Sequence, residues 1–89
     1  MQRLKIIVSG DVQGVGYRWR CYELAKKYNL TGYAKNLKDK TVEVVVEGDE
    51  KFVEEFKSHL PNMPGYTEKV DEIESTEIEK TNHEKFEIM

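Results

Sequence analysis

Apolar and polar residues alternate at the start of the chain and then change to a longer period. Leu4, Ile6 and Val8 alternate with Lys5 and Ser9, which is typical of a strand with one buried face. The following apolar residues recur three or four positions apart, as on the buried face of an amphipathic helix. This predicted helix begins at Tyr17, ends at Asn29 and buries Tyr17, Cys21, Leu24, Ala25 and Tyr28.

The middle of the chain predicts a hairpin and a second helix. Strands are expected at residues 31–38 and 41–47, because β-branched residues alternate with polar ones there, and residues 38–40 form the turn between them. Asp49 is the predicted N-cap of the second helix, and Pro61 ends it. The face of this helix that is expected to be buried consists of Phe52, Val53, Phe56 and Leu60.

The last third of the chain predicts two more strands. Residues 68–78 form the first of them, and the odd spacing of Val70 and Ile73 indicates a bulge. A last short strand contains Phe86 and Ile88.

The resulting order is βαββαβ with an additional terminal strand. Two helices with one apolar face each can cover only one side of a sheet. The sequence therefore predicts an α+β fold, a two-layer ferredoxin-like sandwich with a mostly antiparallel sheet and a short extra C-terminal strand. Its 89 residues are expected to form a single domain.

Composition narrows the functional classes. The longest apolar runs are three residues, whereas a membrane-spanning helix needs roughly twenty, so no membrane association is expected. Cys21 is the only cysteine, which excludes an intrachain disulfide and a cysteine-based metal site. We expect a cytoplasmic monomer without a metal or another cofactor.

The net charge of −3 hides an asymmetry between the two halves. Residues 1–48 contain nine Lys and Arg against five Asp and Glu, whereas residues 49–89 contain five against twelve. A nucleic-acid binder would need a positive face throughout, so this class is disfavoured. The basic half permits a small anionic ligand, and an uneven solvated surface is the simpler alternative.

The loop at residues 10–16 contains three glycines between the first strand and the first helix. A helix N-terminus offers unpaired N–H groups, and glycines let successive N–H groups turn toward one anion. Arg18 follows in the first helical turn, where its guanidinium group can reach such an anion. The dinucleotide-binding pattern GxGxxG would need a glycine where the chain has Trp19. A Walker loop would need Gly-Lys at residues 15–16, so neither nucleotide-binding pattern is present. An anion site or a tight turn with an exposed arginine would both explain the loop.

Asn36 is the second candidate residue. Alternation along its strand places it on the same face as Ala34 and Gly32, which the helices are expected to cover. A buried amide needs hydrogen-bond partners, so Asn36 either satisfies the backbone at the strand end or lies beside Arg18 in a functional site. The other polar or aromatic candidates are expected to be bystanders or core residues: His59, His83, Cys21, and Trp19 on the other helix face.

Residues 10–18 read GDVQGVGYR and resemble the acylphosphatase signature G-x-V-Q-G-V-x-[FY]-R. The resemblance continues through residues 30–36 and ends at residues 86–88, so it covers nearly the whole chain. The chain departs from the family pattern at Asp39-Lys40, where Asp-Gly is usual. A type I′ turn requires positive φ at both central residues, which Lys40 disfavours.

The resemblance implies a hydrolase that cleaves the carboxyl–phosphate bond of small acyl phosphates by direct attack of water. It implies that Arg18 helps the loop to hold the phosphoryl group and that Asn36 positions the water. Inorganic phosphate is then the expected product and competitive inhibitor. The phosphate-binding residues that the resemblance implies are Gln13, Gly14, Val15, Gly16, Tyr17 and Arg18.

The alternative is a non-catalytic ferredoxin-like regulatory module that binds phosphate or another anion. Such a module could keep the loop while lacking Arg18 or Asn36, and this chain has both. An RNA-binding module of this fold would need an RNP-type strand, which neither inner strand provides.

Overall fold

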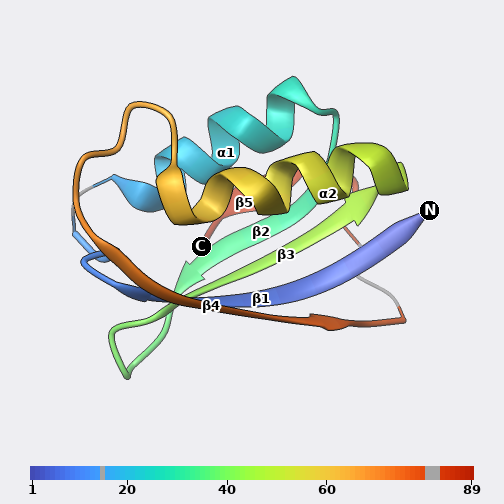
Figure 1. Cartoon of the computed structure of the whole chain (residues 1–89). Coiled ribbons are helices and arrows are strands. Elements are labelled where there is room, and N and C mark those ends of the chain that lie inside the picture. The colour runs from blue at the N-terminus through green and yellow to red at the C-terminus, as the bar shows by residue number, and fades with distance from the viewer. Residues whose placement is uncertain (15, 80–82) are drawn as a thin grey trace.

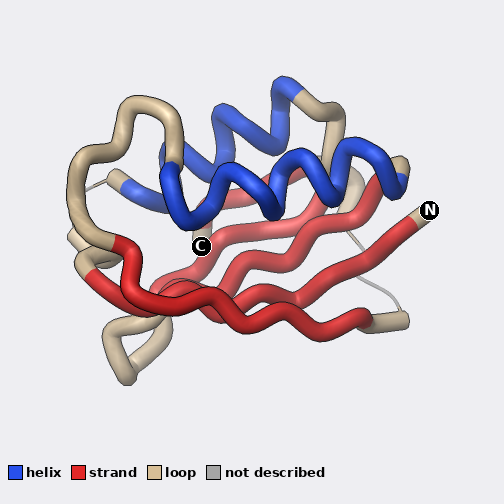
Figure 2. The backbone as a smooth tube through the Cα atoms, viewed as in Figure 1, coloured by secondary structure: helices blue, strands red, loops and turns tan. Residues whose placement is uncertain are grey.

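The predicted succession of strands and helices is present in the computed structural model, which describes residues 1–14, 16–79 and 83–89. Two helices cover one face of a five-stranded sheet (Figure 1 and Figure 2), so the ferredoxin-like sandwich is confirmed. No helix in these ranges has the length and apolar composition that a membrane span requires. The elements are β1 (Gln2–Gly10), α1 (Tyr17–Lys27), β2 (Thr31–Asn36), β3 (Val42–Gly48), α2 (Glu50–His59), the 3₁₀ turn η1 (Leu60–Asn62), β4 (Val70–Glu77) and β5 (Phe86–Ile88).

The strands lie in the order β4-β1-β3-β2-β5. The first three pairings in this order are antiparallel, and only β5 runs parallel to its neighbour, with Gly32 of β2 opposite Phe86. The mostly antiparallel sheet and the extra C-terminal strand are therefore confirmed. Because β5 covers the outer edge of β2, the end of the chain lies beside α1 (Figure 1).

The core lies between the helices and the sheet. Leu4, Ile6 and Val8 of β1 stand opposite Val46, Val44 and Val42 of β3, so the predicted alternation places all six on the helix-covered face. The helices add their own apolar faces to this layer, which removes the apolar surface from water and stabilises the fold. The buried residues of α1 and α2 are Tyr17, Cys21, Leu24, Ala25, Val53 and Phe56.

Asn29 ends α1, as predicted. Its φ of 57° lies in the left-handed region, and its N–H donates to the carbonyl of Lys26. The N–H of Leu30 donates to the carbonyl of Ala25, which completes a Schellman motif and leaves Leu30 packed into the core. This sharp end directs the chain straight into β2.

The second helix begins as predicted but buries less of its surface. The Asp49 carboxylate accepts a hydrogen bond from the N–H of Lys51, which confirms the N-cap. Phe52 was expected in the core, and this expectation is wrong: its side chain is 39% exposed. The aromatic ring stacks on Tyr28 at the helix surface, 5.8 Å between centroids, because the Phe52 position lies at the edge of the apolar face.

The hairpin between β2 and β3 does not form a type I′ turn, the turn that Lys40 was expected to disfavour. The N–H of Lys40 donates to the carbonyl of Leu37, and the N–H of Leu37 donates to the carbonyl of Thr41. The resulting loop has three residues, and only Lys40 takes a positive φ, of 71°. Asp39 accepts hydrogen bonds from the N–H and hydroxyl groups of Thr41, which hold the pKa of this carboxyl below its usual range.

The predicted bulge is present at the end of β1 and the start of β4. Ser9 stands opposite Glu72, and Gly10 opposite Val70, so Asp71 is the extra residue. The strand itself is largely exposed, because β4 lies at the edge of the sheet and neither helix covers it fully. The bulge lies where β1 passes into the glycine loop.

Three chain segments meet at one end of the sheet. Val42, at the start of β3, pairs with Val8 near the end of β1 and with Asn36 at the end of β2. The loop that leaves β1 leads into the N-terminus of α1. The topology therefore brings the glycine loop, the start of α1 and the end of β2 to the same edge.

The positive φ of Lys40 predicts a stabilising substitution. Glycine adopts this conformation without a steric cost, so we expect Lys40→Gly to raise the free energy of unfolding by about 1 kcal/mol. Urea unfolding followed by circular dichroism measures the change. The matched control is Lys38→Gly, where φ is not positive and added chain entropy should lower stability. Equal effects of the two substitutions would contradict the assignment of strain to Lys40.

Candidate active site

The glycine loop has the backbone conformation of an anion-binding loop. Gly14 and Gly16 have φ values of 77° and 87°. A Cβ atom at either position would meet nothing within 4 Å, so glycine is required there for its conformation and not for space. Gly16 is also the N-cap of α1 and makes no side-chain capping bond. The N–H groups of the first helical turn therefore remain available at the loop.

The charges at the start of α1 favour an anion. The first turn contains no acidic residue, although acids are the groups that normally stabilise this end of a helix dipole. Arg18 lies there instead, and adds a positive charge to the positive end of the dipole. Its Nη1 donates to the backbone oxygen of Met89 at 2.6 Å, so among the described residues one of its five side-chain N–H groups is engaged.

Gln13 attaches the loop to the β2–β3 hairpin. Its side-chain Nε2 donates to the carbonyls of Leu37 and Thr41, each at 2.8 Å. Leu37 directly follows Asn36, so this side chain fixes the loop against the end of β2. The predicted phosphate-binding role of Gln13 can therefore involve only its backbone.

The segment between η1 and β4 supports the other side of the loop. The hydroxyl of Tyr66 donates to the carbonyl of Asp11, and the N–H of Asp11 donates to the carbonyl of Lys69 at 2.7 Å. Tyr66 also packs edge-on against Tyr17, with ring centroids 4.9 Å apart. The hydroxyl of Tyr17 donates to the carbonyl of Leu60 at 2.9 Å, so the side chain that begins α1 is anchored in the core.

Asn36 stands at the end of β2 with a buried oxygen. Its Oδ1 has no hydrogen-bond partner among the residues that the structure describes. The neighbouring residue on the same face, Ala34, is fully buried and accepts a hydrogen bond at its carbonyl from the N–H of Met89. A buried amide oxygen without a protein partner is uncommon, and Asn36 carries one at the same sheet end as Arg18.

A hollow of about 310 Å³ lies over the start of α1. Its floor is the glycine loop and its rim includes side chains of α1 and β5. The lining residues are Val12, Gly14, Gly16, Tyr17, Arg18, Trp19 and Ile88.

Comparison with known proteins identifies the family. The family model for acylphosphatase matches residues 4–88. An acylphosphatase of Vibrio vulnificus is 44% identical over 85 residues, which cover 96% of this chain and 93% of that protein. The chain belongs to the acylphosphatase family. Its activity is the hydrolysis of acyl phosphates, and its substrate is a small molecule of that class.

Solved structures agree with this assignment. The crystal structure of an acylphosphatase from Bacillus subtilis matches with a TM-score of 0.90 and 37% identity, over 100% of this chain and 99% of that one. HypF from T. kodakarensis matches with a TM-score of 0.86 and 38% identity over the whole of this chain, but over only 12% of its own length. The acylphosphatase fold therefore also occurs as one part of a longer protein.

The structure of this acylphosphatase brings four of the seven predicted site residues together in one hollow, whereas Gln13 and Asn36 are not among its lining residues. Gly14, Gly16, Tyr17 and Arg18 line one hollow, with the side chain of Tyr17 held in the core. Val15 lies outside the described residues. The structure adds Tyr66, whose support of the loop the sequence analysis did not predict because it depends on a contact between positions 55 residues apart.

Cys21 and the two histidines lie elsewhere in the acylphosphatase fold. Cys21 is fully buried, and this burial raises the pKa of its thiol well above the usual value. His59 stacks on Tyr28, while His83 contacts Tyr33 and Glu87. No group of three His, Cys, Asp or Glu side chains within residues 1–14, 16–79 and 83–89 could hold a metal ion.

The two hydrogen bonds of Gln13 predict a measurable loss of stability. We expect Gln13→Met to lower the free energy of unfolding by about 1–3 kcal/mol, because it removes both side-chain hydrogen bonds that attach the loop to the hairpin. The control is Gln2→Met, since the buried Oε1 of Gln2 has no partner among the described residues. Chemical unfolding of both variants measures the difference. If Gln13→Met were as stable as the parent, the loop would not depend on this attachment.

Proposed function

We propose that this acylphosphatase holds the phosphoryl group of its substrate between the loop at residues 13–18 and the guanidinium group of Arg18. The uncapped N-terminus of α1, with no acid and one arginine in its first turn, supports this proposal most directly. Positive charge that is unfavourable for the helix alone becomes favourable when an anion binds. The positive φ values of Gly14 and Gly16 support the same role for the loop backbone.

The hydrolysis of an acyl phosphate requires little more than positioning of the reacting groups and stabilisation of the negative charge. An acyl phosphate is a mixed anhydride, and its leaving group is a weakly basic carboxylate, so no strong general acid is needed. Catalysis of phosphoryl transfer then depends on orienting the attacking group and stabilising charge on the equatorial oxygens. The loop N–H groups and Arg18 supply donors for these oxygens.

Asn36 is the residue that we assign to the attacking water. Its buried Oδ1 can accept a hydrogen bond from water, while the attachment of Gln13 to Leu37 keeps the end of β2 against the loop. The described lining of the hollow contains no carboxylate or imidazole group that could act as a base. A phosphoryl oxygen of the substrate then accepts the proton of the water.

The same proposal extends to the product, the assembly state and the location of the protein. Inorganic phosphate, as the product, should compete with substrate for the loop. The chain is proposed to act as one domain and as a monomer. A cytoplasmic location remains a prediction from the sequence.

Arg18 should be needed both for binding and for rate. We expect Arg18→Gln to lower kcat/KM by about 10²-fold or more and to abolish most of the rise in Tm that phosphate causes in the parent. Lysine should substitute poorly, because it lacks the planar set of donors. Hydrolysis of acetyl phosphate and thermal scans with phosphate measure both effects.

The matched control for this experiment is Arg20→Gln on the same helix. Arg20 pairs with Glu23 at the surface, at 3.0 Å, and does not line the hollow. Its loss should leave hydrolysis unchanged. If Arg18→Gln hydrolysed substrate at the parent rate, the assignment of Arg18 would be wrong.

Asn36 should affect turnover much more than affinity. An interaction with the attacking water counts chiefly in the transition state, so its removal lowers kcat and leaves KM nearly unchanged. We expect Asn36→Ala to lower kcat on the order of 10²–10³-fold, by analogy with the loss of an oxyanion donor. Asn62→Ala, at an exposed position of η1, is the control.

A phosphate-inhibition series on folded Asn36→Ala separates two roles of this side chain. Unchanged inhibition together with low kcat supports positioning of water. Weakened inhibition together with low kcat would show that Asn36 supports the loop instead, and would contradict the proposed role.

A further inference from the structure

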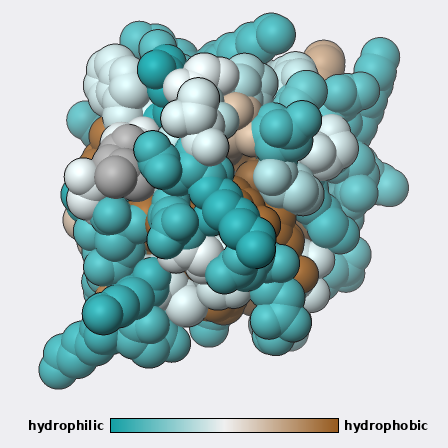
Figure 3. Space-filling view, turned by 60° about the vertical axis from the view of Figure 1, so that its left-hand side comes forward, coloured by the Kyte–Doolittle hydropathy of each residue, from teal (hydrophilic) through white to brown (hydrophobic). Residues whose placement is uncertain are grey.

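Trp19 places a large aromatic surface directly beside the glycine loop. Its side chain is 51% exposed and lines the hollow together with Gly16 and Arg18. The indole ring stacks on Tyr22, with centroids 5.2 Å apart and planes at 24°, so its orientation is fixed. Hydrophilic residues cover most of the surface seen in Figure 3, with hydrophobic residues showing only in limited patches. An exposed tryptophan at the candidate active site therefore differs from the general character of the surface.

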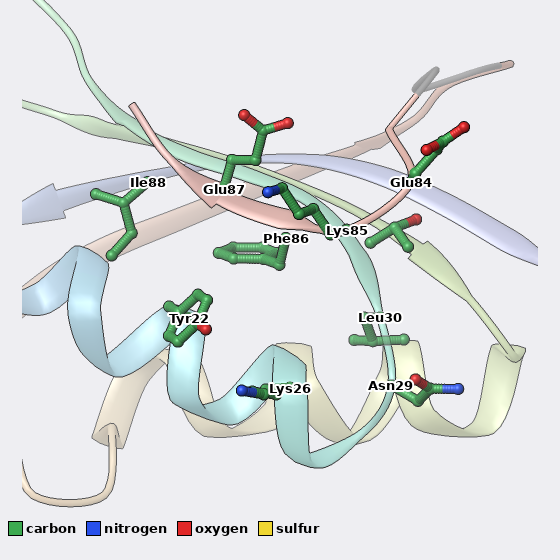
Figure 4. A pocket seen from close by; sticks show the side chains of 10 residues that line it. Tyr22, Lys26, Asn29, Leu30, Glu84, Lys85, Phe86, Glu87 and Ile88 are labelled. Atoms are coloured by element: carbon green, nitrogen blue, oxygen red, sulfur yellow. The ribbon is translucent and has the colours of Figure 1, made fainter.

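Ile88 faces the same hollow from β5. Its side chain is 42% exposed and lines both this hollow and a second one, of about 530 Å³, between α1 and β5. Figure 4 shows Ile88 and Phe86 pointing from β5 toward α1, where Tyr22 lies across from them. Since Tyr22 lines the second hollow and stacks on Trp19, a row of apolar side chains leads from the glycine loop toward the space between α1 and β5. Charged residues, Lys26 and Glu87 among them, line the rest of the second hollow.

We propose that Trp19, Tyr22 and Ile88 bind the acyl group of the substrate. The enzyme then prefers acyl phosphates with an aromatic or extended apolar acyl group over those with a short one. This inference rests on the proposed function, because it requires the phosphoryl group to lie in the loop. A group attached to that phosphoryl group leaves the loop within reach of the Trp19 and Ile88 side chains, which line the same hollow.

The physical basis is the burial of apolar surface and stacking of rings. An aromatic acyl group placed on Trp19 loses contact with water and gains the offset stacking that ring pairs favour. These contacts are remote from the reacting phosphorus and are equally strong in the ground and transition states. Their loss therefore raises KM and leaves kcat unchanged.

Binding of unreactive phosphonates tests the inference without catalysis. Calorimetry should show benzylphosphonate binding about 3–10-fold more tightly than methylphosphonate. Trp19→Ala should abolish this preference while the affinity for methylphosphonate stays the same, and Trp19→Phe should retain most of it. Because Trp19 is the only tryptophan, its fluorescence in the parent should also change with benzylphosphonate and not with methylphosphonate.

Steady-state kinetics provides the second part of the experiment. For Trp19→Ala we expect KM for benzoyl phosphate to rise about 3–10-fold with kcat unchanged, and KM for acetyl phosphate to rise much less, because an acetyl group places only one methyl group on the ring. Phe52→Ala is the matched control, because Phe52 is also an exposed aromatic residue on a helix and stacks on a tyrosine, Tyr28.

The outcomes distinguish the two proposals. If both acyl phosphates are hydrolysed and Trp19→Ala leaves the aromatic preference intact, the assignment of the acyl group is wrong while the proposed function stands. If neither acyl phosphate is hydrolysed but the phosphonate preference depends on Trp19, the subsite stands and the proposed catalytic function fails. Equal binding of the two phosphonates to the parent overturns the subsite.

Discussion

The backbone shape of the glycine loop is the constraint on which the candidate site depends. Gly14 and Gly16 permit the required positive φ values, but glycine also leaves the unfolded chain the most freedom to lose. Among the described residues of the loop, Val12 alone has a side chain buried in the core, so packing of the loop itself offsets only part of this cost. Gln13 on one side and Tyr66 on the other provide the hydrogen bonds that fix it. Both contacts reach segments far away in the sequence, so the loop takes its shape only once the sheet and the segment after η1 are in place.

The start of α1 favours an anion at the cost of some stability of the helix itself. A carboxylate in the first turn would stabilise the helix dipole but would also repel the ligand. The chain has Gly16 and Arg18 at these positions instead. Met89 then accepts a hydrogen bond from Arg18 through its backbone oxygen, which orients the guanidinium group without placing an acidic side chain in the hollow. Affinity for the ligand and stability of the free helix are thus in direct opposition here.

Most of the fold could be predicted from the sequence, because the hydrophobic periodicity and the residues typical of helix ends agree along the chain. The alternation in β1, the stop at Asn29 and the cap at Asp49 are all local features, and each is confirmed. Phe52 was predicted wrongly for a physical reason: whether a residue at the edge of a helix face is buried depends on tertiary packing. The glycine loop and Arg18 could be identified from the sequence as candidate site residues. Trp19 did not, since only the packing of β5 beside α1 shows what an exposed ring faces.

The two edges of the sheet differ from its centre in a way that affects association between molecules. An unpaired strand edge can template pairing with another chain. β5 offers only three residues for such pairing, and β4 presents the exposed carboxylates of Glu72, Glu74 and Glu77. At neutral pH, two β4 edges that approach each other bring like charges together. The repulsion between these carboxylates therefore opposes edge-to-edge aggregation at the longer of the two sheet edges.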